Sequence, residues 1–334
     1  MGGGQVQMKI AVVGLGAMGG YMAARMLAAG LSPVALVTRR HLQPLNLHGL
    51  RLASGGRQTA HPITASDDPR VLGRQDLILL AVKATSLPSI APTLAPMIGP
   101  DTLIVAAMNG VPWWFFHGLD AAQAKAPIEA VDAGGAISAA LPPRQCIGCV
   151  LHLAASMPEP GLIAHAFGNR FLLGDPMARG SGGAGRAAAI VELMCRAGMD
   201  AVVSEDIHAE VWYKLWGNMT MNPVSALTGA TMDLILRDDD VRNFMSRAMI
   251  EAGEVSRKVG IALPVTPEER HKLAAQLGAF KTSMLQDVEA SRPIELDALV
   301  GTVIEIAGRL GVDVPNIRAL MGLTRLRARQ LGLY

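Results

Sequence analysis

The first thirty residues constrain the fold most strongly, because they combine an apolar strand, a glycine-rich turn and a helix. Residues 8–30 read MKIAVVGLGAMGGYMAARMLAAG and contain the spacing G-x-G-x-x-G. In such a turn the first glycine makes the tight bend, the second lets the backbone approach a pyrophosphate, and the third lets helix and strand pack closely. The alternative is a glycine-rich turn without a ligand. The predicted dinucleotide-binding loop consists of Gly14, Leu15, Gly16, Ala17, Met18 and Gly19.

A second stretch, GSGGAG at 180–185, has the same glycine spacing. The residues DPMAR separate it from the end of the preceding apolar run, so its first glycine does not lie at a strand tip. We interpret this second pattern as a flexible surface loop.

Further apolar runs predict a parallel, doubly wound α/β sheet. They cover residues 33–40, 76–84 and 101–110, and near-continuous apolar runs are typical of strands buried on both faces. Alternating, β-rich stretches follow up to about residue 176, and the chain becomes helical from about residue 205. The expected organisation is a flexible tail at 1–7, a dinucleotide-binding α/β domain at 8–204 and an all-helical C-terminal domain at 205–334.

Composition excludes several classes of protein. Half of the 334 residues are hydrophobic, only 17% are charged, and the formal net charge is +2. This predicts a large core and gives no reason to expect nucleic acid or a membrane surface as a partner. No run of 18 apolar residues and no signal-peptide layout is present, and three cysteines fit a reducing compartment. We therefore expect a cytoplasmic protein.

The residues after the second strand favour NADP over NAD. Arg39 lies twenty residues after Gly19 and is followed by Arg40, in the segment VALVTRRHLQ. An NAD site usually has an acid near this position to bind the ribose 2′-hydroxyl, and this segment has none. Two arginines suit a 2′-phosphate instead; solvated surface arginines are the alternative.

Lys83 and Asn109 follow the third and fourth predicted strands. Ligands of open α/β sheets bind outside the carboxyl ends of the strands, so both residues are candidates for the site. A solvated lysine at a strand end and an ordinary Asn-Gly turn are the alternatives.

In the C-terminal half, YKLWGNMTMN at 213–222 places Lys214, Asn218 and Asn222 at helical spacing on one face. The stripe is either a solvated helix face or one wall of a site. Its apolar flanks predict a mostly buried helix, in which amines and amides need partners. Pro223 predicts that the helix bends or ends there.

A second polar cluster lies in the stretch from 281 to 315, where Ser283 and Asp287 are four residues apart. Pro293 suggests the first residue of a new helix, with Glu295 in its first turn. Taken alone, Glu295 could simply complement the helix dipole.

Cys146, Cys149 and His152 are the remaining candidate cluster, in CIGCVLH. They offer at most three metal ligands, and no second pair follows nearby, so we expect neither a metal site nor a redox site.

Five ordered blocks resemble the ketopantoate reductase (2-dehydropantoate 2-reductase) family, over nearly the whole chain. They are GLGAMG at 14–19, AVKA at 81–84, NGV at 109–111, KLWGNMTMNPVSALTG at 214–229 and TSMLQDVEASRPIELDALVG at 282–301. The resemblance implies a Rossmann-type NADP-binding domain, a helical substrate and catalytic domain, and an active site in the cleft between them. It implies NADPH-dependent reduction of 2-dehydropantoate to (R)-pantoate, in pantothenate biosynthesis.

The resemblance also implies individual roles. Lys214 matches the general acid, and Glu295 matches a carboxylate that helps to hold substrate and cofactor. Arg39 would bind the 2′-phosphate of NADPH, while Lys83 and Asn109 would line the cofactor and substrate cleft. The implied polar groups for substrate are Asn109, Lys214, Asn218, Asn222 and Ser283. No metal is required.

The segment PWWFF at 112–116 departs from the family, which commonly has a small glycine after NGV. Its aromatic residues either line the substrate site, which would favour another 2-oxo acid, or simply pack against the sheet. A noncatalytic NADPH sensor is a further alternative, and the chain could be a monomer or a homodimer.

Overall fold

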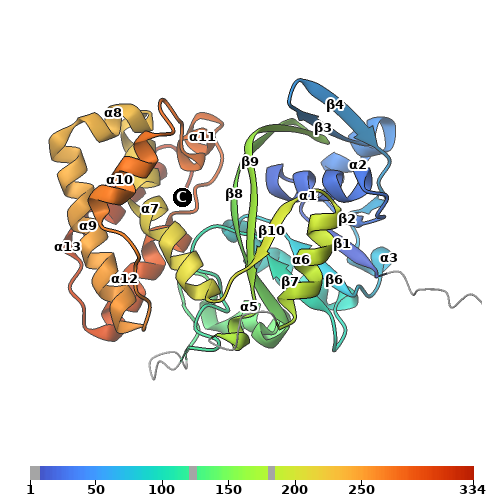
Figure 1. Cartoon of the computed structure of the whole chain (residues 1–334), viewed down its shortest axis with the longest axis horizontal. Coiled ribbons are helices and arrows are strands. Elements are labelled where there is room, and N and C mark those ends of the chain that lie inside the picture. Colours follow the sequence, from blue (N-terminus) through green and yellow to red (C-terminus); the bar gives the residue numbers. More distant parts are fainter. Residues whose placement is uncertain (1–7, 120–125, 180–184) are drawn as a thin grey trace, which may run out of the picture. The chain divides into compact units, whose positions relative to one another are not determined.

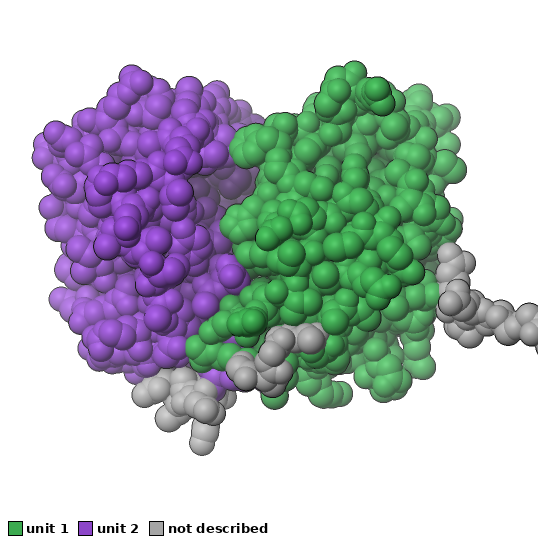
Figure 2. All heavy atoms as spheres, viewed as in Figure 1, with its two compact units in different colours: residues 1–108, 137–207 green, residues 109–136, 208–334 purple. Residues whose placement is uncertain are grey.

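The structure, a computed structural model, describes residues 8–119, 126–179 and 185–334. It divides the chain into two compact units (Figure 2), formed by residues 1–108 with 137–207 and by residues 109–136 with 208–334. The segment 109–136 therefore belongs with the C-terminal helices, so that the chain passes between the units three times. The expected tail at 1–7 and residues 180–184 of the second glycine pattern lie outside the described residues.

Unit 1 contains a mixed ten-stranded sheet. Six neighbouring strands are parallel: β5 (Ala65–Ser66), β2 (Val34–Leu36), β1 (Ile10–Val13), β6 (Leu77–Leu80), β7 (Leu103–Ala106) and β8 (Cys146–Glu159). All four residues of β1 and β6 are buried, as expected for strands covered on both faces. The apolar runs thus form the parallel sheet predicted from the sequence.

The rest of the sheet is partly antiparallel. β9 (Leu162–Gly174) pairs antiparallel with β8, and its other edge pairs in parallel with both β3 (Leu50–Ser54) and β10 (Asp200–Val203). β4 (Arg57–His61) closes this end as an antiparallel partner of β3. The alternating, β-rich middle of the chain is therefore a long hairpin that extends the parallel sheet.

Helix α1 (Ala17–Ala28) is central to unit 1, because it contacts β1, β3, β4, β8 and β9, and the sheet curls around it (Figure 1). Met22 and Met26 of α1 share one hydrophobic core with Phe171 of β9 and Ile190 of α6. The helices of the α/β part are α1, α2 (Arg39–His48), α3 (Pro69–Leu72), α4 (Leu87–Ile90), α5 (Ala136–Ala140) and α6 (Ala187–Arg196).

Unit 2 is helical, as the sequence predicts. Its helices are α7 (Ile207–Thr228), α8 (Met232–Arg237), α9 (Asp239–Lys258), α10 (Pro267–Ala275), α11 (Ser283–Glu289), the π-helix η7 (Asp297–Gly301), α12 (Thr302–Leu310) and α13 (Pro315–Gln330). Among the described helices of both units, none is long and apolar enough to cross a membrane.

Polar side chains of α7 and α9 form hydrogen bonds to neighbouring helices. The Trp216 indole of α7 donates to the Met249 carbonyl of α9 at 2.6 Å. The buried Glu251 carboxylate of α9 accepts from the backbone N–H groups of Asn316 and Ile317, at 3.0 Å each. Glu251 thus caps the first turn of α13, where helical N–H groups have no partner within the helix.

Pro223 does not end α7, which continues for five residues beyond it to Thr228. Met221 and Val224 on either side are buried in the core of unit 2. We attribute the continuation to this packing, which offsets the hydrogen bond that the proline cannot donate.

Candidate functional site

The glycine loop after β1 has the geometry that its spacing predicts. Gly14 has φ +88°, and its N–H donates to the Leu36 carbonyl at 3.0 Å. A Cβ atom on Gly14 would lie 2.7 Å from the Val82 side chain, and one on Gly19 would lie 2.0 Å from the Gly14 carbonyl oxygen. The first glycine therefore makes the bend, and the third lets α1 pack against that bend.

Gly16 differs from these two glycines because the space into which a side chain would project is empty. It is the N-cap of α1, and a Cβ atom there would meet nothing within 4 Å. The first turn of α1 carries no acid, so the positive end of the helix dipole is not neutralised locally. Backbone N–H groups facing open space at a helix start are suited to an anionic group such as a pyrophosphate.

Lys83 and Asn109 follow neighbouring strands on the same edge of the sheet as this loop. Leu80 at the end of β6 pairs with Val13 of β1 and with Ala106 of β7, and the two residues come three positions after their strands. Lys83 belongs to unit 1, whereas Asn109 is the residue at which the chain enters unit 2.

Arg39 begins α2 and lines a cavity of about 450 Å³ in unit 1. Its side chain is 91% exposed, and its Nε donates to the Asp67 carboxylate at 2.9 Å. The lining residues are Arg39, Asp67, Asp68, Pro69, Arg70, Thr93 and Pro96.

Asp67 and Arg70 were not expected from the sequence as neighbours of Arg39. Because β5 pairs in parallel with β2, Leu36 against Ser66, the residues that follow these strands come together. β5 has only two residues, so no apolar run marked it in the sequence. The Arg70 side chain forms three hydrogen bonds of 2.8–3.1 Å with Asp68, whereas Arg39 forms one with Asp67 and is the more exposed of the two arginines.

The predicted stripe on α7 lies on a continuous helix. Lys214 and Asn218 are half-buried, and Asn222 is only 6% exposed. Neither amide side chain, Asn218 or Asn222, forms a hydrogen bond with another described residue. Buried amides are normally hydrogen-bonded, so this face of α7 has the character of a surface that receives a polar ligand.

Ser283 and Glu295 lie elsewhere in unit 2. Ser283 is the exposed first residue of α11, which Thr282 caps by accepting from the Leu285 N–H at 3.2 Å. Asp287 accepts from Arg292 at 3.0 Å, which gives this acid a structural role.

The prediction that Pro293 begins a helix is wrong, because the helix starts at Leu296 and Glu295 immediately precedes it. The Glu295 carbonyl accepts from the Leu299 N–H at 3.2 Å, so the turn is closed from Glu295 rather than from the proline. Residues Asp297–Gly301, which form η7, are π-helical, a geometry that recurs at functional sites.

Within unit 2, the segment that starts at Asn109 lies against η7. The Val111 N–H donates to the Ala298 carbonyl at 3.0 Å. Gly110 has φ +84°, and a Cβ there would lie 2.5 Å from the same carbonyl oxygen. The structure therefore brings the Asn109 and Glu295 segments together through a close backbone approach that only glycine permits.

The aromatic segment 112–116 is buried, and two of its rings pack against the first turns of α7. All four aromatic side chains are less than 10% exposed. The Phe115 ring lies 5.7 Å from the Trp212 ring and 5.6 Å from the His208 ring, and Trp114 lies 5.9 Å from His208. These aromatic residues therefore anchor the first turns of the helix that carries Lys214.

Cys146 and Cys149 are buried on β8. Burial raises the pKa of the Cys146 thiol, which disfavours the thiolate that metals and oxidants require. Within residues 8–119, 126–179 and 185–334, no three His, Cys, Asp or Glu side chains gather in a way that could hold a metal ion.

Comparison with known proteins agrees with this geometry. The family description "Ketopantoate reductase PanE/ApbA" matches residues 10–177, and "Ketopantoate reductase PanE/ApbA C terminal" matches residues 206–328. A 2-dehydropantoate 2-reductase of Mesorhizobium japonicum is 40% identical over 328 residues, which cover 98% of this chain and 100% of the relative.

Two solved structures extend the comparison. A candidate ketopantoate reductase of Ralstonia solanacearum MolK2 is 45% identical, with a TM-score of 0.93 over 98% of this chain and 100% of that one. D-mandelate dehydrogenase, solved with NADH and anilino(oxo)acetate, has the same fold at 21% identity, with a TM-score of 0.83 over 98% of this chain and 100% of that one.

Proposed function

This chain belongs to the ketopantoate reductase family, and we propose that it reduces 2-dehydropantoate to (R)-pantoate with NADPH, a step of pantothenate biosynthesis. The observation that carries the proposal is the continuous face of α7, on which Lys214 lies beside two amides that form no hydrogen bond with another described residue. Family membership supports an oxidoreductase that binds a dinucleotide, and the residues of this chain support the finer assignment.

The cofactor-binding residues fit NADPH. The open side of Gly16 and the amino end of α1 suit the pyrophosphate, together with Leu15, Ala17 and Met18 of the same loop. Arg39 is exposed and can bind a 2′-phosphate with paired charge-assisted hydrogen bonds. Lys83, Asn109 and Glu295 complete the proposed cofactor set. NADPH supplies a hydride when bound.

The residues of this chain then act on the 2-oxo acid. As the carbonyl carbon receives the hydride, negative charge develops on the carbonyl oxygen. The Lys214 ammonium stabilises that charge and donates the proton that completes the alcohol. Neutral amides and a hydroxyl hold the rest of the substrate without adding charge. These proposed substrate groups are Asn109, Asn218, Asn222 and Ser283.

The test is NADPH oxidation by the purified full chain with ketopantoate, pyruvate, 2-oxoisovalerate and benzoylformate. Ketopantoate should give the highest kcat/KM. Strong turnover of another acid without turnover of ketopantoate would show a different 2-oxo acid reductase.

Two variants separate the roles. Lys214→Ala should lower kcat by about 10²–10⁴-fold and leave NADPH binding unchanged. NADPH binding without turnover of any acid by the unmodified chain would instead support a sensor. Arg39→Gln should weaken NADPH binding at least about tenfold and leave NADH binding unchanged.

A further inference from the structure

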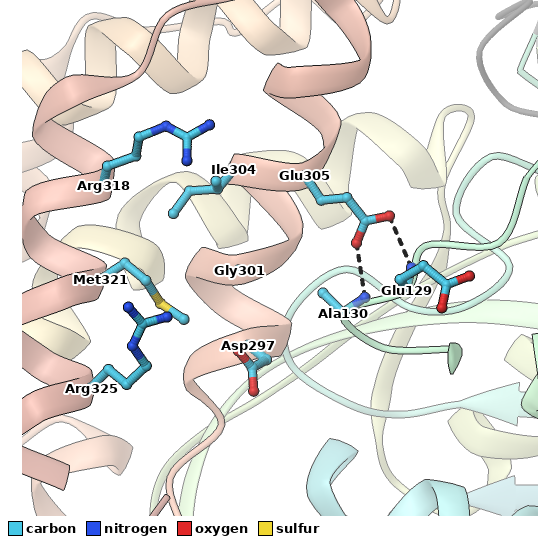
Figure 3. A pocket seen from close by; sticks show the side chains of 9 residues that line it. All are labelled: Glu129, Ala130, Asp297, Gly301, Ile304, Glu305, Arg318, Met321 and Arg325. Carbon is cyan, nitrogen blue, oxygen red and sulfur yellow. Dashed lines mark hydrogen bonds between the residues drawn. The ribbon is translucent and has the colours of Figure 1, made fainter. Parts of the chain in front are cut away.

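A second cavity, of about 600 Å³, lies wholly within unit 2. Figure 3 shows α13 forming one wall, η7 and the start of α12 the next, and the Glu129–Ala130 segment the third. None of its lining residues belongs to the set proposed for the reaction. They are Glu129, Ala130, Asp297, Gly301, Ile304, Glu305, Arg318, Met321 and Arg325.

The Glu305 carboxylate of this cavity has a full set of partners. It accepts from the backbone N–H groups of Glu129 at 2.9 Å and Ala130 at 2.8 Å (Figure 3), and from the Arg309 guanidinium at 2.5 Å. Glu305 and Arg309 therefore neutralise each other and fasten the Glu129 segment to α12. Glu129 itself accepts from the Gly134 N–H at 3.0 Å.

The two arginines of α13 differ from this neutralised pair. Arg318 and Arg325 are seven residues apart, which is two helical turns and about 10 Å along the axis, so they lie on one face. Neither side chain forms an ion pair or hydrogen bond with another described residue. Met321 lies between them in Figure 3, and Ile304 adds a second apolar surface from α12.

Asp297 supplies an open acceptor beside these arginines. Its Oδ1 accepts from the Tyr334 hydroxyl at 2.8 Å, and its Oδ2 accepts no hydrogen bond from another described residue. A carboxylate oxygen with spare acceptor capacity suits a neutral donor such as a hydroxyl group. The open groups of the cavity are thus two cationic donors and the free oxygens of the Asp297 and Glu129 carboxylates, around a small apolar surface.

We propose that this cavity binds a small hydroxylated organic anion. Its phosphate or carboxylate would be bound by Arg318 and Arg325, and a hydroxyl group would donate to Asp297. Its carbon skeleton would contact Met321 and Ile304. Guanidinium groups form charge-assisted hydrogen bonds with such anions, and a volume of this size is ordinary for a small-molecule site.

The test is calorimetric titration of the full chain with glycerol 3-phosphate, inorganic phosphate and glycerol. Glycerol 3-phosphate should bind at one site more tightly than phosphate, and glycerol should not bind. Arg318→Gln and Arg325→Gln should each weaken binding at least about tenfold. Asp297→Asn should remove the preference for glycerol 3-phosphate over phosphate.

Two matched controls locate the binding. Arg327→Gln changes an exposed arginine of the same helix that does not line the cavity, and it should alter affinity less than about twofold. Arg39→Gln should also leave the affinity unchanged, which excludes the cofactor arginine in unit 1. Thermal melting checks that every variant is folded. Absence of binding up to about 10 mM, or equal affinity in the Arg318 and Arg325 variants, would overturn the proposal.

Discussion

The Arg39–Asp67 and Asp175–Arg186 pairs of unit 1 differ from the polar groups on α7 and in the α13 cavity of unit 2 in how other residues engage them. In unit 1, Arg39 is paired with Asp67, and Asp175 is bound by both Nε and Nη2 of Arg186 at 2.7 Å. In unit 2, the Asn218 and Asn222 amides and the two arginines of the α13 cavity form no such contacts with described residues.

The difference separates two uses of polarity. A group whose partners belong to the same unit contributes to stability, and its removal should be measured as a change in unfolding. A half-buried or buried group without a partner adds no hydrogen bond to the free protein, and its removal should be measured mainly as a change in ligand binding. The following variants test this distinction, beginning with the largest expected effect.

Glu251→Ala should lower the free energy of unfolding by about 3 kcal/mol, because it removes an acceptor of several hydrogen bonds and leaves the buried N–H of Ile317 without one. The urea midpoint measures the change. Glu251→Gln should be intermediate. Glu254→Ala, on the exposed side of the same helix, should cost less than about 0.5 kcal/mol, and an equal loss in both alanine variants would contradict the capping role.

Asp175→Asn should lower the free energy of unfolding by about 2 kcal/mol at neutral pH. Burial raises the pKa of this carboxyl, but the hydrogen bonds from Arg186 and the Met177 N–H outweigh it and hold the pKa below its usual value. A lowered folded-state pKa means that the stabilisation is complete above the unfolded-state pKa, near 3.9, and is lost as the pH falls through the folded-state pKa.

The difference between the parent chain and Asp175→Asn should therefore shrink in unfolding experiments below about pH 4. Asp200→Asn is the matched control, because the Asp200–Arg170 pair is about half exposed and should contribute little. A difference that grows on acidification would exclude the Asp175–Arg186 interaction as its cause.

Asn222→Ala should behave in the opposite way. It should lower kcat/KM for the 2-oxo acid about ten- to thirtyfold, mainly through KM, because a hydrogen bond to substrate is lost. The melting temperature and NADPH affinity should stay nearly unchanged, since the amide has no described partner in the free protein. A large loss of stability with unchanged KM would make Asn222 a structural residue.

Asp67→Asn should have the smallest effect and should tighten NADPH binding about two- to fivefold. The exposed Arg39–Asp67 pair must open before Arg39 can bind a phosphate, and exposed pairs are weak. Fluorescence titration with NADPH and NADH measures the change, and NADH affinity should not increase in parallel. Weaker NADPH binding would mean that Asp67 orients Arg39 rather than competing for it.

The parallel sheet and the glycine loop were predictable from the sequence because both depend on local patterns. The four-residue apolar runs of β1 and β6 are buried throughout, and the +88° φ of Gly14 follows from the turn that its spacing requires. The helical nature of the C-terminal part was equally clear.

Other features depend on contacts between distant segments and were not predictable. The pairing of two-residue β5 with β2 brings Asp67 to Arg39, and nothing near Arg39 in the sequence indicates it. Similarly, the segment 109–136 joins unit 2 through its aromatic contacts with α7 and the Val111–Ala298 hydrogen bond. The helix that contains η7 starts at Leu296 rather than at Pro293, and the Val111–Ala298 hydrogen bond lies in its first turn.

Unit 2 is built from two separate stretches of the chain, 109–136 and 208–334, and this affects folding during synthesis on the ribosome. Trp114 and Phe115 are made about one hundred residues before Trp212, the helix residue that covers Phe115. Until α7 emerges, this aromatic segment has no partner to bury it, although the strands on either side of it can already pair. We therefore expect the nascent chain to expose this apolar segment while the residues up to α7 are made.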